Sequence, residues 1–310
     1  MASPGHRPIR NTDRQERVRV PESARPQLTS KATLPYYQRP SKPRARRRSL
    51  ESAVLGGAEE REPTLLDAAA GSFGTSARTT DPTLSEAVIG VDDRIRVTAQ
   101  RMMLNPWRQI CALRIVSQTE RTFVGTGWFI APNVLATAGH CVFLQDEGGW
   151  ARSIRVIPAK DGAEEPFGSQ TTTRFASVDG WVEKRKRDFD YGVIFLDDPR
   201  VGTQLGNFAV QALDVLELKG NDAQISGYPA DRDRATIQFF HMRPILDVTD
   251  ARLVYDIDTF GGQSGSPIWR ETDEAGLVAI GVHTTGGVSS NSGTRITGDV
   301  IENLAQWTTE

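Results

Sequence analysis

The stretch Asp258-Thr259-Phe260-Gly261-Gly262-Gln263-Ser264-Gly265-Ser266-Pro267 decides how this sequence of 310 residues is interpreted. Three glycines surround Ser264, and glycine permits the left-handed backbone conformations that a tight turn needs. Such a turn can project the Ser264 hydroxyl while the amides of Gly262 and Ser264 converge on a developing negative oxygen. The pattern predicts a nucleophilic serine with an oxyanion hole, although an ordinary glycine-rich turn is the alternative.

The sequence on both sides of this loop predicts an all-β protein. From about Val88 onward, apolar or alternating runs of strand length are separated by Gly, Pro, Asn and Asp, which is typical of a sandwich or barrel. An α/β hydrolase shares the Gly-Xaa-Ser-Xaa-Gly motif but needs alternating strands and helices, which this pattern lacks. One helix is expected at the end of the chain, capped by Asp299, with apolar residues at helical spacing: Val300, Ile301, Leu304 and Trp307.

A nucleophilic serine needs a base, and the sequence offers four histidines. His140 lies in Ala136-Thr137-Ala138-Gly139-His140-Cys141, where small neighbours leave room for an imidazole to face a cleft. His6 lies in the amino-terminal region, and His241 has no comparable partner in the sequence, so it is expected to be structural. The fourth histidine, His283, follows a long apolar run and is considered below.

Asp190 is the expected partner of His140. It stands at the start of the apolar run Tyr191–Leu196, where a carboxylate is costly to bury unless it accepts hydrogen bonds. Accepting one from His140 Nδ1 would satisfy it and fix the imidazole tautomer. Asp188 is the rival, but the basic run beside it indicates a solvated turn, and capping of the strand end is the alternative role for Asp190.

The order His140, Asp190, Ser264 is the order found in chymotrypsin. On these residues the sequence resembles the chymotrypsin-fold serine proteases, and more closely their glutamyl endopeptidase branch, over about residues 87–307. Separated motifs carry the resemblance: Ala87–Arg94, Gly125–Pro132, Thr137–Cys141, Asp190–Gly192, Ser226–Pro229, Tyr255–Thr259 with the serine loop, and Ile280–His283.

The resemblance implies two six-stranded antiparallel β-barrels with the active site between them. The first barrel would span about residues 87–205, the second about 206–298, and the final helix about 299–307. Ser264 would attack the peptide carbonyl, His140 would act as base and then acid, and Asp190 would stabilise the imidazolium. The resemblance implies protein or peptide substrates and neither a metal nor an organic cofactor. A catalytically silent peptide-binding module is the alternative.

The resemblance also implies a substrate pocket. In the glutamyl branch a threonine five residues before the nucleophile and a histidine after the apolar run bind a substrate carboxylate, and these positions hold Thr259 and His283 here. A hydroxyl and an imidazole N–H would favour Glu, and Asp less, before the cleaved bond. The alternative for His283 is a strand histidine bonded to a backbone carbonyl.

Gln263 occupies the position where digestive relatives carry an aspartate that pairs with the new amino terminus. In the glutamyl branch that terminus instead lies near the specificity pocket. We therefore expect cleavage after Glu86, which frees Ala87 and makes residues 1–86 a disordered, basic pro-segment. The two cysteines leave two alternatives. Cys141 directly follows the base, a common disulfide position in this fold, so it could bond to Cys111. The other alternative is two buried thiols.

Charge is distributed unevenly along the chain. Residues 1–50 hold 11 Arg and 2 Lys against 3 acids, whereas the whole chain has a net charge of -2. The basic arm Arg39–Arg48 could contact phosphates, but it lacks interleaved aromatics, so no nucleic-acid partner is expected. No apolar run is long enough for a membrane span or a signal peptide. A secreted or extracellular location is implied by the resemblance alone, and a monomer is favoured.

Overall fold

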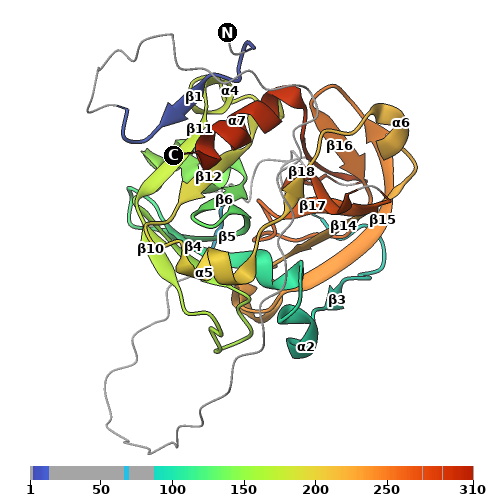
Figure 1. Cartoon of the computed structure of the whole chain (residues 1–310), viewed down its shortest axis with the longest axis horizontal. Coiled ribbons are helices and arrows are strands. Elements are labelled where there is room, and N and C mark those ends of the chain that lie inside the picture. Colours follow the sequence, from blue (N-terminus) through green and yellow to red (C-terminus); the bar gives the residue numbers. More distant parts are fainter. Residues whose placement is uncertain (1–2, 14–65, 70–86, 274, 288, 310) are drawn as a thin grey trace, which may run out of the picture.

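The computed structural model describes residues 3–13, 66–69, 87–273, 275–287 and 289–309. Within these ranges two large β-sheets lie side by side, with short helices between their strands and a longer helix at the carboxyl end (Figure 1). The prediction of an all-β protein with a C-terminal helix is therefore confirmed. The basic arm Arg39–Arg48 and Glu86 lie outside the described residues.

The second sheet forms a closed barrel. Its hydrogen-bonded order is β18-β17-β14-β15-β16-β19, and β19 pairs again with β18, so six strands complete the circle among the described residues. All of these pairs are antiparallel. The sheet contains β3 (Ile95–Arg96), β13 (Ala209–Val210), β14 (Asp222–Gly227), β15 (Phe239–Val248), β16 (Arg252–Tyr255), β17 (Pro267–Thr272), β18 (Gly276–Thr285) and β19 (Asn291–Arg295).

The sheet that corresponds to the predicted first barrel is a half-barrel. Among the described residues its path runs β11-β12-β6-β5-β4-β9-β10, and no ladder joins β10 to β11, although only Thr173 separates them in the chain. One connecting residue is too short for an antiparallel hairpin, so the prediction of a closed six-stranded barrel is confirmed for the second sheet and corrected for the first. The strands are β1 (Pro8–Arg10), β2 (Leu66–Asp67), β4 (Ile110–Val116), β5 (Thr122–Ala131), β6 (Val134–Thr137), β9 (Ser153–Pro158), β10 (Gln170–Thr172), β11 (Arg174–Val178) and β12 (Gly192–Phe195), and β7 (Phe143–Leu144) pairs with β8 (Gly149–Trp150).

The boundary predicted for the first barrel needs one correction. Strand β3 pairs with β15 of the second sheet, so the beginning of the 87–205 range belongs to the second barrel. The physical reason is a buried carboxylate. Asp258 accepts the backbone N–H groups of Ile89 and Asp93 at 2.7 and 2.9 Å, which holds this segment against the second barrel.

Helices occupy the connections. They are α2 (Ala99–Met102), α3 (Gly139–Val142), α4 (Asp179–Val182), α5 (Arg200–Leu205), α6 (Val215–Leu218) and α7 (Gly298–Thr308), with 3-10 turns at Trp107–Gln109, Gln145–Glu147, Arg187–Phe189 and Asp233–Ala235. In the described part of the chain, no helix is both long and apolar enough to cross a membrane.

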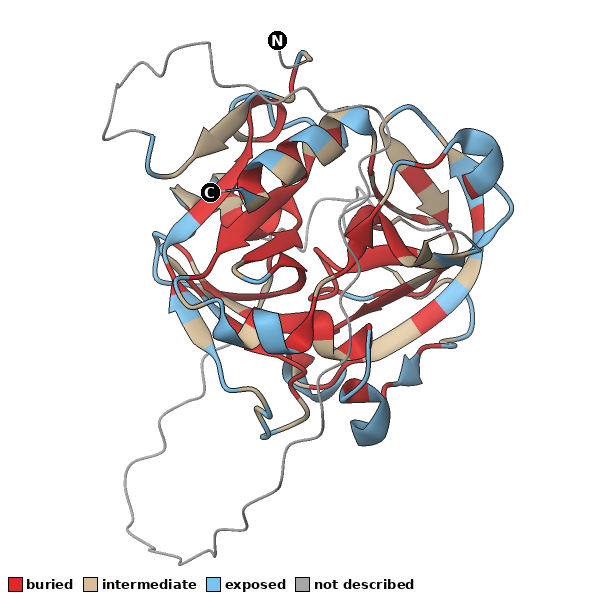
Figure 2. Ribbon diagram, viewed as in Figure 1, coloured by how far each residue is buried: buried red, intermediate tan, exposed pale blue. Residues whose placement is uncertain are grey.

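Buried residues occupy most of the strands of both sheets, and exposed residues lie mainly on the outer helices and loops (Figure 2). Strand β5 is buried along almost its whole length, since it faces the barrel interior on one side and other buried groups on the opposite side. Burying a large apolar side chain contributes roughly 1.5–3 kcal/mol. The largest fully buried side chains include Trp128, Trp181, Trp307, Tyr191, Tyr228 and Tyr255.

Helix α7 packs against β5 and β6 through the residues that the helical spacing predicted. Val300, Leu304 and Trp307 are buried on one face. The predicted cap was wrong, because the helix begins one residue earlier than expected and Thr297 caps it by accepting the Val300 N–H. Asp299 instead lies in the first turn, where a negative charge favours the helix terminus, and it accepts a hydrogen bond from Ser3 at 2.8 Å.

Two short parts of the predicted pro-segment are described, and both contact the barrels. Strand β1 adds antiparallel to β11, at the edge of the first sheet. Strand β2 pairs in parallel with β5 at Phe123 and Val124. The prediction of a largely disordered segment did not anticipate either contact, because edge strands are held by backbone hydrogen bonds that carry little sequence signature.

Candidate active site

His140 and Asp190 meet where β6 and β12 end side by side. The two strands pair antiparallel with Thr137 opposite Gly192, so the residues just beyond them converge. Asp190 accepts two hydrogen bonds from His140, one from the backbone N–H to Oδ1 at 2.9 Å and one between Nδ1 and Oδ2 at 2.8 Å. Both side chains are fully buried. This arrangement fixes the plane of the imidazole.

The charge of Asp190 controls the protonation of His140. Burial disfavours the imidazolium, but the neighbouring carboxylate outweighs it, so the pKa of His140 is raised well above its ordinary value. Asp190 also accepts a hydrogen bond on its backbone carbonyl from Thr294 of β19 at 3.1 Å, which ties it to the second barrel. The rival Asp188 is exposed, as its basic surroundings predicted.

Gly139 explains why a small residue precedes the histidine. A Cβ atom there would lie 2.8 Å from the Trp181 ring and 3.1 Å from Asp190 Oδ1. Separations under 3.0 Å force something to shift, so a larger residue would displace the indole beside the pair. The small neighbours of His140 therefore serve close packing of the His140–Asp190 pair.

The Ser264 loop joins the second barrel to the first. The backbone carbonyl of Ser264 accepts the Thr126 N–H at 2.8 Å and the Cys141 thiol at 3.6 Å. Cys141 directly follows His140 in the sequence. Thr126 Oγ1 also donates to the Gly262 carbonyl at 2.8 Å. The structure thus brings the Ser264 loop against the segment that carries His140.

Two glycines in this loop have a backbone that other residues rarely adopt. Gly262 has φ +99° and Gly265 has φ +89°. A Cβ atom on Gly262 would lie 2.6 Å from the Tyr228 carbonyl oxygen, and one on Gly265 would lie 2.1 Å from the Thr126 carbonyl oxygen. The Gly262 N–H donates to Asp67 Oδ1 at 2.9 Å, so this amide holds a negatively charged oxygen.

His283 and Thr259 are both fully buried in the second barrel. Tyr255 OH and His283 Nδ1 are 2.6 Å apart, a contact that the sequence did not predict. Among the described residues, the Thr259 hydroxyl is a buried group without a hydrogen-bond partner. A buried hydroxyl of this kind is costly unless a ligand completes it.

Ala87 lies beside this pocket. Its carbonyl accepts the Thr259 N–H at 3.3 Å, and its N–H donates to Asn291 Oδ1 at 3.1 Å. Asn291 Nδ2 in turn donates to the carbonyls of Ala87 and Ile257 at 2.6 and 2.8 Å. The sequence did not indicate a role for Asn291. Its contacts are with Ala87, about two hundred positions away, and the residues next to Asn291 form no recognisable motif.

His241, which the sequence suggested to be structural, lies beside two carboxylates. Asp93, His241 and Asp258 bring their ligand atoms within 4.8 Å of one another. However, His241 Nδ1 accepts the Asp258 N–H at 2.8 Å, Asp93 accepts Arg243 at 2.8 Å, and Asp258 holds two backbone amides. These bonds engage His241 Nδ1 and part of the acceptor capacity of each carboxylate.

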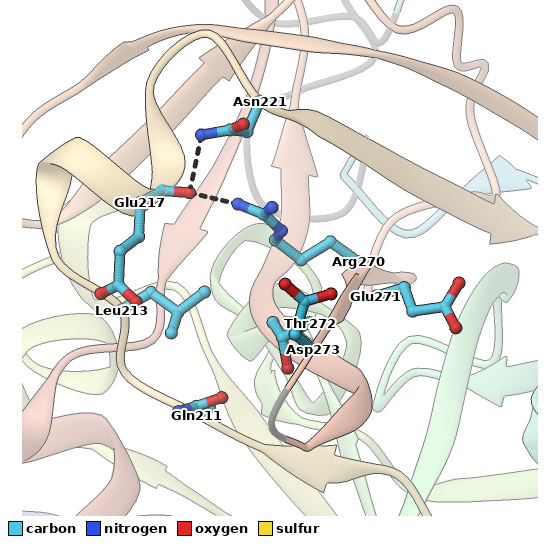
Figure 3. A pocket seen from close by; sticks show the side chains of 8 residues that line it. All are labelled: Gln211, Leu213, Glu217, Asn221, Arg270, Glu271, Thr272 and Asp273. Atoms are coloured by element: carbon cyan, nitrogen blue, oxygen red, sulfur yellow. Dashed lines mark hydrogen bonds between the residues drawn. The ribbon is translucent and has the colours of Figure 1, made fainter.

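A separate surface pocket of about 310 Å³ lies on the second barrel, and none of the residues above lines it. Figure 3 shows Asn221 and Arg270 both donating to the backbone carbonyl of Glu217 at its rim. This pocket is distinct from the candidate active site. Its lining residues are Gln211, Leu213, Glu217, Asn221, Arg270, Glu271, Thr272 and Asp273.

Comparison with known proteins identifies relatives of this chain. The chain is 38% identical over 229 residues to a glutamyl endopeptidase of Bacillus licheniformis, covering 72% of this chain and 69% of the relative. It is 36% identical over 222 residues to a Bacillus subtilis protein named extracellular metalloprotease, and the match covers 71% of this chain and 69% of that protein. No protein-family profile matches the sequence.

Solved structures agree in fold. A Glu endopeptidase structure matches with a TM-score of 0.63 and 26% identity, covering 72% of this chain and all of the other. A protease from Arthrobacter nicotinovorans matches with a TM-score of 0.55 and 18% identity, covering 65% of this chain and 95% of the other. This match supports the fold alone. The four histidines of the present chain include no His-Glu-Xaa-Xaa-His pair, the usual zinc motif of metalloproteases.

Cys111 and Cys141 are free thiols, so the structure has the pair of buried thiols and not a disulfide between them. Cys141 Sγ points to the Ser264 carbonyl, whereas Cys111 Sγ lies 3.8 Å from the Gln109 carbonyl. A Cβ on Gly125 of β5 would be 2.9 Å from the Cys141 sulfur, so Cys141 packs closely against this strand. Each thiol is therefore packed separately.

We predict that neither thiol reacts until the protein unfolds. Both cysteines are fully buried, and burial raises the pKa of the Cys111 thiol. Iodoacetamide should add nothing to the native protein and two adducts to the denatured protein without reductant, as measured by intact mass. An unchanged mass after denaturation would instead reveal a disulfide.

Proposed function

The chain belongs to the glutamyl endopeptidase family of chymotrypsin-fold serine proteases and is a serine-type endopeptidase. From this premise we propose that it cleaves peptide bonds after Glu, with His140, Asp190 and Ser264 as its catalytic triad. The observation that carries the proposal is the buried His140–Asp190 pair beside the Ser264 loop. A catalytically silent module is disfavoured, because the relatives are proteases.

The proposed reaction follows from these groups. Ser264 Oγ attacks the peptide carbonyl carbon while His140 Nε2 takes the hydroxyl proton, and the carbonyl oxygen becomes an oxyanion. The amides of Gly262 and Ser264 stabilise that oxyanion. His140 then gives its proton to the leaving amine, which leaves an acyl-enzyme that water hydrolyses by the same sequence. Asp190 keeps Nδ1 protonated and stabilises the imidazolium throughout.

The preference for Glu rests on the pocket at Thr259 and His283. A Glu carboxylate could accept hydrogen bonds from the buried Thr259 hydroxyl and from His283. The contact between Tyr255 and His283 Nδ1 orients the ring and engages that nitrogen, which directs Nε2 to other partners. Gln presents no charge to these donors, and charge-assisted bonds are about twice as strong as neutral ones.

Residues 1–86 are proposed to be a pro-segment, and the mature enzyme to begin at Ala87. Cutting after Glu86 would convert the Ala87 N–H into an ammonium group. That group would lie next to Asn291 and close to Thr259, where its positive charge would favour an acidic substrate side chain. The enzyme would then act outside the cell, as the name of its Bacillus subtilis relative says of that protein.

We predict that Asp190→Asn lowers kcat by about 10⁴-fold, since the imidazole loses its orienting acceptor. The pH profile should move as well. Free histidine has a pKa of about 6.5, and the pKa of His140 is raised above it. Wild-type activity should therefore appear only as the pH rises through the higher pKa of His140, where the imidazole becomes neutral. Loss of the carboxylate should shift this limb to lower pH. Asp188→Asn, on the exposed turn, is the matched control and should change neither quantity.

We predict strong discrimination between paired peptides that differ only by Glu or Gln before the cut. Thr259→Val removes the hydroxyl at constant size and should reduce the Glu-to-Gln ratio of kcat/KM about tenfold, the value of one hydrogen bond to a charge. Tyr255→Phe should act in the same direction by releasing His283. Thr203→Val, on exposed α5, is the control. Equal rates on Glu and Gln, or cuts after Arg, Lys or aromatics, would refute the pocket.

We predict that active enzyme purified after self-processing begins at Ala87. Amino-terminal sequencing of the active fraction measures this, and Glu86→Gln should slow its appearance because the bond would no longer follow the preferred residue. Full activity in a chain that still begins at Met1 would contradict the proposal.

A further inference from the structure

Residues Leu66–Ala69 lie against β5 and contact the Ser264 loop. Leu66 and Asp67 pair with Phe123 and Val124 of β5, and the Ala68 N–H donates to the Val124 carbonyl at 3.0 Å. Ala68 and Ala69 are buried, at 0% and 3% exposure. A peptide that adds to a strand in this way is held by its backbone, whatever its side chains.

The side chain of Asp67 reaches the position where charge would develop in catalysis. Its Oδ1 accepts the Gly262 N–H at 2.9 Å. Gly261 permits this approach, because a Cβ atom there would lie 2.9 Å from the Asp67 Cβ and 3.0 Å from its carboxyl carbon. The carboxylate oxygen therefore engages one of the two amides proposed to form the oxyanion hole.

Val124 links the two contacts. It pairs with Asp67 on β5, and its Cγ2 atom would lie 3.2 Å from a Cβ on Gly262. The strand that binds the Leu66–Ala69 backbone thus also packs against the amide that binds the Asp67 carboxylate. A substrate carbonyl and the Asp67 carboxylate could not both occupy the Gly262 N–H.

We propose that Leu66–Ala69 is a built-in competitive inhibitor, with Asp67 occupying the oxyanion hole of the uncleaved chain. The inhibitor is an acidic peptide segment of the chain itself. The inference rests on the proposed roles of Ser264 and Gly262, and it adds a function to residues that the proposed reaction does not use.

The other described part of the same segment holds it to the enzyme. Strand β1 pairs with β11, the Arg7 N–H donates to Asp179 at 3.0 Å, and Asn303 Nδ2 donates to the His6 carbonyl at 2.8 Å. A second attachment on the same chain raises the effective concentration of the first. The inhibitor therefore needs little affinity of its own for β5 and the Gly262 N–H.

The test is the rate at which a fluorophosphonate labels Ser264 in the intact, full-length chain, followed by the mass of the uncut adduct. Asp67→Ala should be labelled about 10- to 100-fold faster than wild type, the factor that a hydrogen bond to a charge contributes. Asp67→Asn keeps the size but not the charge and should fall between them. Asp13→Ala, whose carboxylate accepts the Arg10 N–H at 2.8 Å, is the matched control and should match wild type.

Equal labelling rates in wild type, Asp67→Ala and Asp67→Asn would overturn the inference alone, provided circular dichroism shows unchanged thermal unfolding for at least one variant. Absence of labelling in every chain would overturn the proposed function, and the inference with it. Faster labelling of Asp13→Ala to the same extent as Asp67→Ala would also overturn it, because the effect would then be general to the segment's acids.

Discussion

The buried carboxylate of Asp190 is the constraint on which the site depends. A charge removed from water is tolerated only when it is hydrogen-bonded, and Asp190 obtains two bonds from His140. Satisfying it fixes the turn that carries the histidine, requires glycine at position 139 and determines the protonation of the imidazole. The Thr294 hydroxyl on the Asp190 carbonyl extends this constraint into the second barrel.

The two barrels meet through a small number of directional contacts at the Ser264 loop. Thr126 binds the loop twice, through its N–H to the Ser264 carbonyl and through its hydroxyl to the Gly262 carbonyl. Gly262 and Gly265 accept backbone conformations and close approaches that a side chain would prevent. Ser264 and His140, the proposed nucleophile and base, therefore come from different barrels, and the packing between the barrels sets their relation.

The amino-terminal segment uses the same surfaces as the proposed chemistry. One part of it extends the edge of the first sheet, and another lies along β5 with its carboxylate on the Gly262 amide. Ala87, the proposed mature terminus, already lies beside Thr259 and Asn291. Activation in this arrangement would change two things together: a carboxylate would leave the oxyanion hole, and a positive charge would appear near the substrate pocket.

The sequence alone determined the all-β class, the glycine-rich serine loop and the pairing of His140 with Asp190, because these depend on local patterns and on the cost of burying a charge. It could not supply the open edge of the first sheet between β10 and β11, the cap at Thr297, the separation of the two thiols, or the contacts of Tyr255, Asn291 and Asp67. Those depend on which distant segments lie side by side. Hydrogen bonds across such distances leave no periodic trace in a single sequence, so only the tertiary structure decided them.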